Sequence, residues 1–255
     1  MQARPWILAE TNWKSVREEK FEVAVLPWGA TEAHNFHLPY ATDNFQCDYV
    51  AGESCRLAWE QNARCIALPT VPFGVQTGQS TIPLCLNMNP STQLAVLSDI
   101  VASLERQNIH KLVVLNGHGG NDFKQMLREL SPRFDVFLCL INWFGVVPRA
   151  GHFEHGGDHA DEMETSAMLH IAPHLVRPLE EAGDGREHRF SIPALREKWA
   201  WTQRDWLQAT SDTGIGNPHE ASEEKGRKYL EEVTRRIAGF LMDLARADRA
   251  ALYEK

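Results

Sequence analysis

Short apolar runs alternate with helical patterns along the first two thirds of the chain. The apolar runs at residues 22–27, 63–68, 111–115 and 136–143 have the length of buried strands. Helical patterns lie at 44–61, 89–107 and 122–130, and two more cover 162–170 and 222–247. Strands that alternate with helices build parallel crossover units. The sequence therefore predicts an α/β fold with a mostly parallel central sheet covered by helices on both faces.

Length and composition fit one domain over residues 1–255. No internal repeat and no linker rich in Pro, Gly or Ser divides the chain, and 43% hydrophobic residues can build a sizeable core. The 26 basic residues against 34 acidic ones, without any basic block, argue against a nucleic-acid or membrane partner. The five cysteines form no CxxC pair, and the first residues do not resemble a signal peptide. We expect a cytoplasmic protein.

The loop after the first predicted strand is rich in metal-binding side chains. Glu32 and His34 are separated by one residue, so in an extended segment their side chains point to the same side. Asp43 follows at an expected helix start, where it could cap the helix or bridge two cations. Ligands bind at the carboxyl edge of such sheets. This loop is therefore a candidate metal-binding loop.

The third predicted strand ends in a glycine-rich loop, Asn116-Gly-His118-Gly119-Gly120-Asn121. Glycines let a backbone approach a ligand closely, and a helix N-terminus offers free amides to an anion. Taken alone the loop could be a tight turn or a phosphate cradle, but it has neither GxGxxG nor a P-loop lysine. His118 would lie at the same sheet edge as the first loop.

A third polar loop follows the fourth predicted strand. Residues 152–166 contain three histidines and five acidic residues, including Asp158, His159 and Glu164. Part of this acidity is the ordinary preference of a helix N-terminus. If the helix begins near Ala160, Glu164 lies in its first turns and can face the sheet edge.

The three loops would bring six side chains to one edge: Glu32, His34, Asp43, His118, His159 and Glu164. Mixed His and carboxylate ligands suit Zn²⁺, Mn²⁺ or Fe²⁺. A carboxylate shared between two ions is what a two-metal hydrolytic site requires. The three loops therefore predict a divalent metal centre at this edge of the sheet.

These motifs resemble the creatininase (creatinine amidohydrolase) family in order and spacing. The similar stretches are 29–34 with Thr42 and Asp43, 116–121, 159–166, and 213–218 with 224–226. The resemblance implies an α/β sandwich, assembly into homo-oligomers such as hexamers, and a two-metal centre that hydrolyses cyclic or linear amides. By position, Glu32, Asp43 and His118 would hold one metal, and His34 with Asp43 the second.

One departure bears on both metal and substrate. Creatininase has Tyr-Glu after the His of the second motif, and this chain has Gly119 and Gly120, so Glu164 is our substitute ligand. The resemblance, with this substitution, implies that the ligands of the divalent centre are Glu32, His34, Asp43, His118 and Glu164, with zinc first and manganese or iron as alternatives. The same change argues against creatinine as substrate. It points to another small-molecule amide or formamide, or to a peptidase acting on a peptide-derived cofactor precursor. The substrate would contact Gly119, Gly120, Ser80 and Asp158.

The expected mechanism is attack of metal-bound hydroxide on an amide carbonyl, with His159 and Glu164 as catalytic residues. His159 would carry a proton to the leaving nitrogen or stabilise the oxyanion. His37 is expected to be structural. Two competing hypotheses are a non-catalytic, metal-stabilised oligomer and a nucleotide-binding transferase. Residues 183–217 show no periodicity, and we expect a long functional loop or an oligomer contact there.

Overall fold

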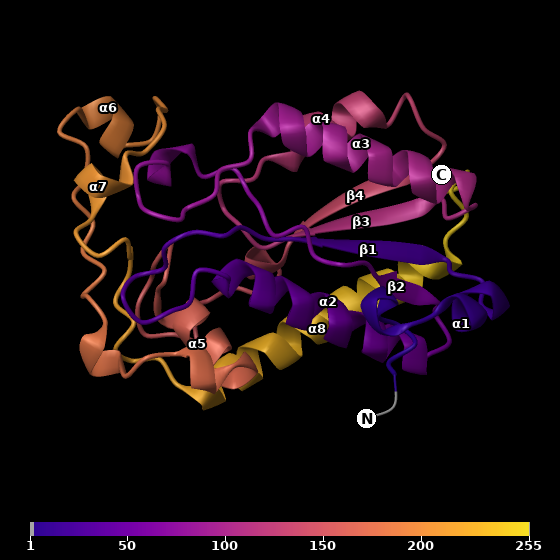
Figure 1. Ribbon diagram of the computed structural model, residues 1–255, viewed down its shortest axis with the longest axis horizontal. Coiled ribbons are helices and arrows are strands. Elements are labelled where there is room, and N and C mark those ends of the chain that lie inside the picture. Colours follow the sequence, from indigo (N-terminus) through magenta and orange to yellow (C-terminus); the bar gives the residue numbers. More distant parts are fainter. Residues whose placement is uncertain (1–2, 255) are drawn as a thin grey trace.

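The computed structural model describes residues 3–254, and its centre is a four-stranded parallel sheet (Figure 1). The strand order is β2-β1-β3-β4, and every neighbouring pair is parallel. The strands are β1 (Val23–Trp28), β2 (Cys65–Ala67), β3 (Lys111–Asn116) and β4 (Phe137–Asn142). The predicted parallel sheet is confirmed.

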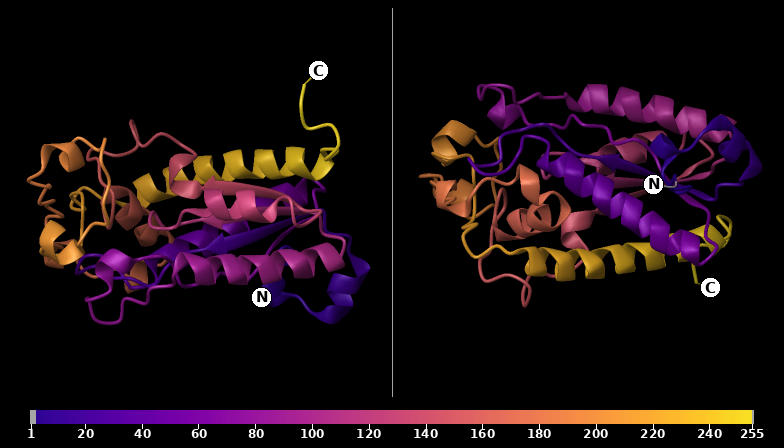
Figure 2. Two further views of the ribbon diagram at one scale, coloured as in Figure 1. Left: turned by 90° about the horizontal axis from the view of Figure 1, so that it is seen from above. Right: turned by 60° about the horizontal axis from the view of Figure 1, so that its bottom comes forward.

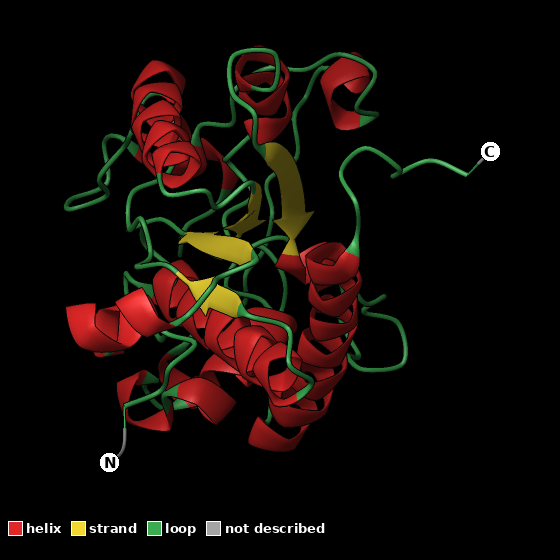
Figure 3. Cartoon of the chain, turned by 90° about the vertical axis from the view of Figure 1, so that its right-hand side faces the viewer, coloured by secondary structure: helices red, strands yellow, loops and turns green. Residues whose placement is uncertain are grey.

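Helices cover both faces of this sheet. They are α1 (Trp13–Glu18), α2 (Thr42–Glu60), α3 (Pro90–Arg106), α4 (Phe123–Leu130), α5 (Glu162–Ile171), α6 (Pro193–Arg196), α7 (Trp206–Ala209) and α8 (Glu223–Arg246). The short 3-10 turns are η1 (Leu8–Glu10), η2 (Thr77–Gln79), η3 (Trp143–Gly145), η4 (Pro173–Leu175) and η5 (Leu179–Glu181). α3 and α8 lie on opposite sides of the strands (Figure 2), and the end-on view shows the strands between two helical layers (Figure 3).

Alternate side chains of the strands fill two separate cores. Val23 and Val25 of β1 point toward α2 and α8, whereas Ala24 and Leu26 point toward α3 and α4. Because successive side chains of a strand face opposite ways, a strand buried on both faces must be apolar throughout. All six residues of β1 are buried. This explains why the predicted strands read as continuous apolar runs rather than as alternating ones.

The loops that follow β1, β3 and β4 meet at one end of the sheet. α2 begins at Thr42, close to the expected start, and Asp43 lies in its first turn. α5 begins at Glu162, as the pattern at 162–170 predicts, and not at Ala160, because Ala160 adopts a positive φ of 49° and Asp161 caps the helix. The segment that contains α6 and α7 lies at this same end, on the left in Figure 1. Among residues 3–254, no helix has the length and hydropathy to cross a membrane.

Candidate metal centre

Two carboxylates and two imidazoles form the inner part of the site. His118 Nδ1 lies 2.8 Å from Glu32 Oε1 and 3.2 Å from Asp43 Oδ2. The other oxygen of Asp43, Oδ1, lies 3.1 Å from His34 Nε2. All four residues are buried. Asp43 therefore stands between the two imidazoles and presents one oxygen to each.

Glu164 and His159 complete the cluster. Glu164 Oε2 lies 4.0 Å from His34 Nε2, and His159 Nδ1 lies 3.8 Å from Glu32 Oε1. Possible ligand atoms come together in three groups, each within 4.8 Å: Glu32, Asp43 and His118; His34, Asp43 and Glu164; and Glu32, His34 and His159. The first two share Asp43, and the third includes His159. The fold thus brings together all six residues that the sequence singled out.

The orientation of the three imidazoles suits cation binding. His34 Nδ1 lies 3.1 Å from the Glu32 carbonyl oxygen, His118 Nε2 lies 2.9 Å from that of Val75, and His159 Nε2 lies 2.8 Å from that of Ala33. A carbonyl can only accept, so each of these ring nitrogens must donate its N–H. In the neutral ring the other nitrogen then turns a lone pair toward the carboxylates, which is how metal-binding histidines are oriented.

Two buried oxygens of the cluster have no hydrogen bond within the described chain. They are Glu32 Oε1 and Asp43 Oδ2, the two atoms closest to His118 Nδ1. A buried carboxylate oxygen without a partner is costly. A divalent cation held between these oxygens and the His118 nitrogen would satisfy all three atoms, so the residues fit a metal.

Burial and mutual attraction shift the pKa values in opposite directions. Although burial alone would lower it, Asp43 and Glu164 raise the pKa of His34 to about 9. Burial would also lower the pKa of His118, but Glu32 and Asp43 hold it well above its usual range. Burial raises the pKa of Glu164 to about 8. Metal-free, the cluster therefore holds protons that a divalent cation would displace.

His159 differs from the other two imidazoles. Burial lowers its pKa to about 4, with the nearby His34 acting in the same direction. Its ring packs against the ring of His34, at 4.1 Å between centroids, and against that of Trp206, at 4.7 Å. The ring is thus neutral at pH 7 and is held by two neighbouring rings.

The family model of creatininase, described as creatinine amidohydrolase, matches residues 9–241. The chain belongs to the creatininase family. A candidate creatinine amidohydrolase from Bacteroides fragilis NCTC 9343 has a crystal structure that superposes with a TM-score of 0.93 at 44% identity, covering 100% of both chains. The resemblance inferred from the motifs is confirmed.

Two further comparisons are more distant. The mycofactocin precursor peptide peptidase of Mycobacterium tuberculosis (strain CDC 1551 / Oshkosh) is 26% identical over 235 residues, covering 85% of each chain. Creatininase structures titled as the Zn-Zn type and as the Mn form have TM-scores of 0.77 and 0.76 at 23% and 22% identity. They cover 96% and 95% of this chain and 100% and 99% of their own, and show the same fold.

In this creatininase-family chain a cavity of about 760 Å³ opens beside the cluster. Its inner wall contains Glu32, His118, Gly119, Gly120 and His159. Of the expected substrate-contacting residues, Gly119, Gly120 and Asp158 line it. Ser80 is not among the lining residues. It is exposed at the end of η2, whereas Gln76 of the same loop lines the cavity.

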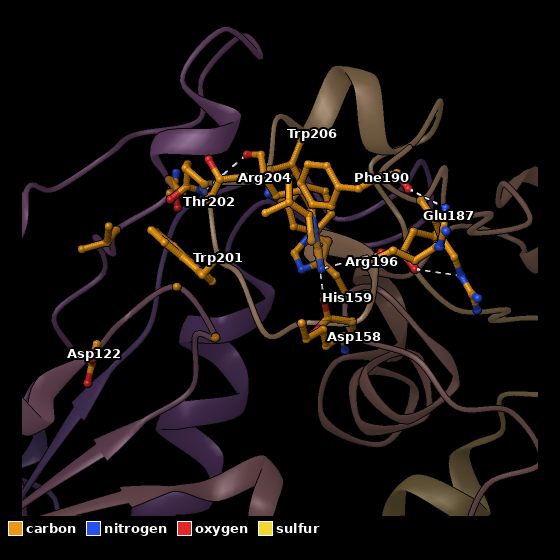
Figure 4. Close-up of a pocket in the computed structure, with 18 of the residues that line it drawn as sticks. Asp122, Asp158, His159, Glu187, Phe190, Arg196, Trp201, Thr202, Arg204 and Trp206 are labelled. Carbon is orange, nitrogen blue, oxygen red and sulfur yellow. Dashed lines mark hydrogen bonds and ion pairs between the residues drawn. The ribbon is translucent and has the colours of Figure 1, made fainter. Parts of the chain in front are cut away.

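The outer wall comes from residues 187–206, inside the segment without periodicity. Figure 4 shows Trp206 and Arg204 next to His159. Arg204 donates to Asp158 at 2.8 Å and lies over the Trp206 ring, 5.0 Å from its centroid. The sequence predicted a functional loop or an oligomer contact over 183–217 but singled out none of the residues of this wall, because the segment shows no periodicity.

Two further buried residues, His37 and Gln79, have contacts near the cluster that indicate their roles. His37, expected to be structural, is buried and its Nε2 lies 2.8 Å from the Thr165 hydroxyl, and it belongs to none of the three ligand groups. Gln79, which sequence reasoning missed, is buried and donates to Glu32 at 2.6 Å. The only signal for Gln79 was its place in a polar loop after β2.

Proposed function

We propose that the chain is a metal-dependent amidohydrolase that cleaves the amide or formamide C–N bond of a small molecule and uses two divalent ions per subunit. The observation that carries this proposal is the position of Asp43, which presents Oδ1 to His34 and Oδ2 to His118. One carboxylate between two ligand groups is the arrangement of two-metal hydrolytic sites. Zinc or manganese suits these ligands, and the related creatininase structures include a Zn-Zn type and an Mn form.

Divalent ions, when bound, would activate water for attack and polarise the amide carbonyl. The protein supplies the rest of the chemistry. His159 uses Nε2 to bond Ala33, so Nδ1 is the atom that can carry a proton to the leaving nitrogen. Gly119 and Gly120 line the cavity, and within residues 3–254 neither N–H donates a backbone hydrogen bond. These amides are suited to stabilise an oxyanion.

The size of the cavity supports a small substrate. About 760 Å³ lies within the range of small-molecule sites, roughly 300–1,000 Å³. Creatinine itself is disfavoured by Gly119 and Gly120. A second candidate activity is cleavage near the end of a short peptide, favoured by the curated relatives named mycofactocin precursor peptide peptidase. We also propose a cytoplasmic homo-oligomer, a hexamer by analogy with the family, which light scattering would test.

The decisive experiment measures metal per subunit after reconstitution with zinc, manganese or iron. The wild type should bind two ions, Glu164→Gln one, and Asp43→Ala none. Asp122→Asn is the matched control, since Asp122 lines the cavity but belongs to no ligand group, and it should keep two. A wild type that binds no metal would overturn the proposal.

A substrate panel then separates the activities. It should contain formamides, cyclic amides, linear amides and short peptides, and the metal-loaded protein should turn over one class while the chelated protein turns over none. A fall in melting temperature or loss of the oligomer on chelation, with no hydrolysis of any member, would instead favour the metal-stabilised assembly. Nucleotide binding that survives chelation would favour a transferase.

A further inference from the structure

Gln79 is a buried side chain that touches the metal centre without belonging to it. It ends η2 and is 0% exposed. Its Nε2 donates to Glu32 Oε2 at 2.6 Å, and Glu32 is 1% exposed. A neutral amide that donates to a buried carboxylate stabilises the charged form without adding charge to the cluster.

A second contact holds the other end of the Gln79 amide. The Glu32 carboxylate can only accept, so the NH₂ group must point to it and the amide oxygen faces Cys85. The Cys85 thiol donates to Gln79 Oε1 at 3.2 Å, and its sulfur accepts from the Ala33 N–H, also at 3.2 Å. These hydrogen bonds run from Glu32 through Gln79 and Cys85 back to Ala33, the residue next to Glu32 in the loop after β1.

The two oxygens of Glu32 consequently differ. Oε2 is occupied by Gln79, whereas Oε1 has no hydrogen bond and lies 2.8 Å from His118 Nδ1 and 3.8 Å from His159 Nδ1. Without the amide, the carboxylate could rotate and turn either oxygen inward.

We propose that Gln79, held by Cys85, is a positioning residue that orients Glu32 so that only Oε1 is offered to the ion shared with Asp43 and His118. This inference rests on the proposed two-metal function. It predicts that Gln79 controls the metal affinity of the position that includes Glu32. The position formed by His34, Asp43 and Glu164 should be unaffected, because it does not include Glu32. Partners that orient metal ligands typically contribute a factor of about 10–100 in affinity.

The test is Gln79→Met, which keeps the length of the side chain and removes its amide. Stepwise zinc affinities are measured by competition with a chelating dye, and the visible spectrum of the cobalt-loaded protein reports the ligand geometry. One of the two affinities should fall about 10–100-fold with a changed cobalt spectrum, and the other should stay within about twofold. The matched control is Thr234→Val, because Thr234 is also a buried polar side chain, but its hydroxyl donates to the Leu230 carbonyl within α8 at 2.8 Å. It should leave both affinities and the spectrum unchanged.

Substitutions at Cys85 keep the inference testable if Gln79→Met does not fold. Cys85 is only half-buried, so small replacements there are tolerable. Cys85→Ala should lower the zinc affinity of the same position as Gln79→Met. Cys85→Ser can still donate to the amide oxygen, so it should keep the wild-type affinity there.

The outcomes separate this inference from the proposed function. Two unchanged affinities in Gln79→Met, or equal losses in Gln79→Met and Thr234→Val, would overturn the positioning role while leaving the two-metal centre in place. A wild type that binds no zinc would overturn the proposed function itself.

Discussion

Gly120 is the position where adding one methyl group should disturb the metal centre most directly. A Cβ atom there would lie 2.1 Å from the Val75 carbonyl oxygen and 2.5 Å from His118 Nε2. These two atoms are the partners of the 2.9 Å hydrogen bond that orients His118. Carbon and oxygen normally approach no closer than about 3.3 Å, so the Val75 oxygen must move by about 1.2 Å. The Val75 N–H, bonded to Asn121 at 2.9 Å, resists that shift.

The magnitude follows from the two contacts. Forcing a methyl group into a packed site costs about 1–3 kcal/mol of folding stability. Loss of the partner that orients a metal-binding imidazole lowers metal affinity about 10–100-fold, equivalent to about 1.4–2.8 kcal/mol. Gly120→Ala should therefore lose both stability and metal affinity, with the loss of affinity at the position that uses His118.

The neighbouring glycine provides the control. A Cβ atom at Gly119 would meet nothing within 4 Å. Gly119→Ala should therefore stay within about 0.5 kcal/mol of the wild type in stability and should bind metal equally well. The assays are thermal unfolding of the chelated proteins and zinc affinity by chelator competition. Equal losses in the two variants, or wild-type affinity in Gly120→Ala, would refute the steric reasoning.

Three further predictions concern individual side chains. His159→Ala should keep two metals and lose turnover; a loss of one metal would make His159 a ligand instead, as its group with Glu32 and His34 allows. Burial lowers the pKa of His37 to about 4 from 6.5, so the unfolded chain takes up its proton first as the pH falls. Between pH 6.5 and 4, metal-free wild type should lose up to about 3 kcal/mol of unfolding free energy relative to His37→Gln, and parallel pH profiles would contradict this. Arg204→Met and Asp158→Asn should each raise KM by the same factor, the double variant should raise it no further, and Tm should change little. A larger rise in KM for Asp158→Asn than for Arg204→Met would mean that Asp158 contacts the substrate directly.

The inner part of the site could be predicted because it follows from the strand pattern. Once 22–27 and 111–115 are taken as parallel strands, their carboxyl ends must lie at one edge, and the loops that follow carry Glu32, His34 and His118 there. Asp43 was predictable because the next helix begins beside it. The positions of these four residues follow from the order of strands and helices, and the hydrophobic periodicity of the sequence predicts that order.

Side-chain direction within short turns could not be predicted in the same way. Among the residues around η2, the sequence pointed to Ser80, one residue beyond Gln79, as a substrate contact. In a 3-10 turn, successive residues point about 120° apart, so a shift of one residue exchanges a buried side chain for an exposed one. Gln79 is buried against Glu32 and Ser80 is exposed. Only the three-dimensional path of the loop decides between them.

The two parts of the site differ in how strongly their residues are constrained. Glu32, Asp43 and His118 are buried, and the His118 Nδ1 atom lies 2.8 and 3.2 Å from the two carboxylates, so a change at any of them leaves a buried charged group without its counterpart. Trp201 and Lys198 of the outer wall are exposed, and substitution there leaves no buried group unpaired. On this argument, substitutions in that wall should change KM and substrate choice without changing metal content.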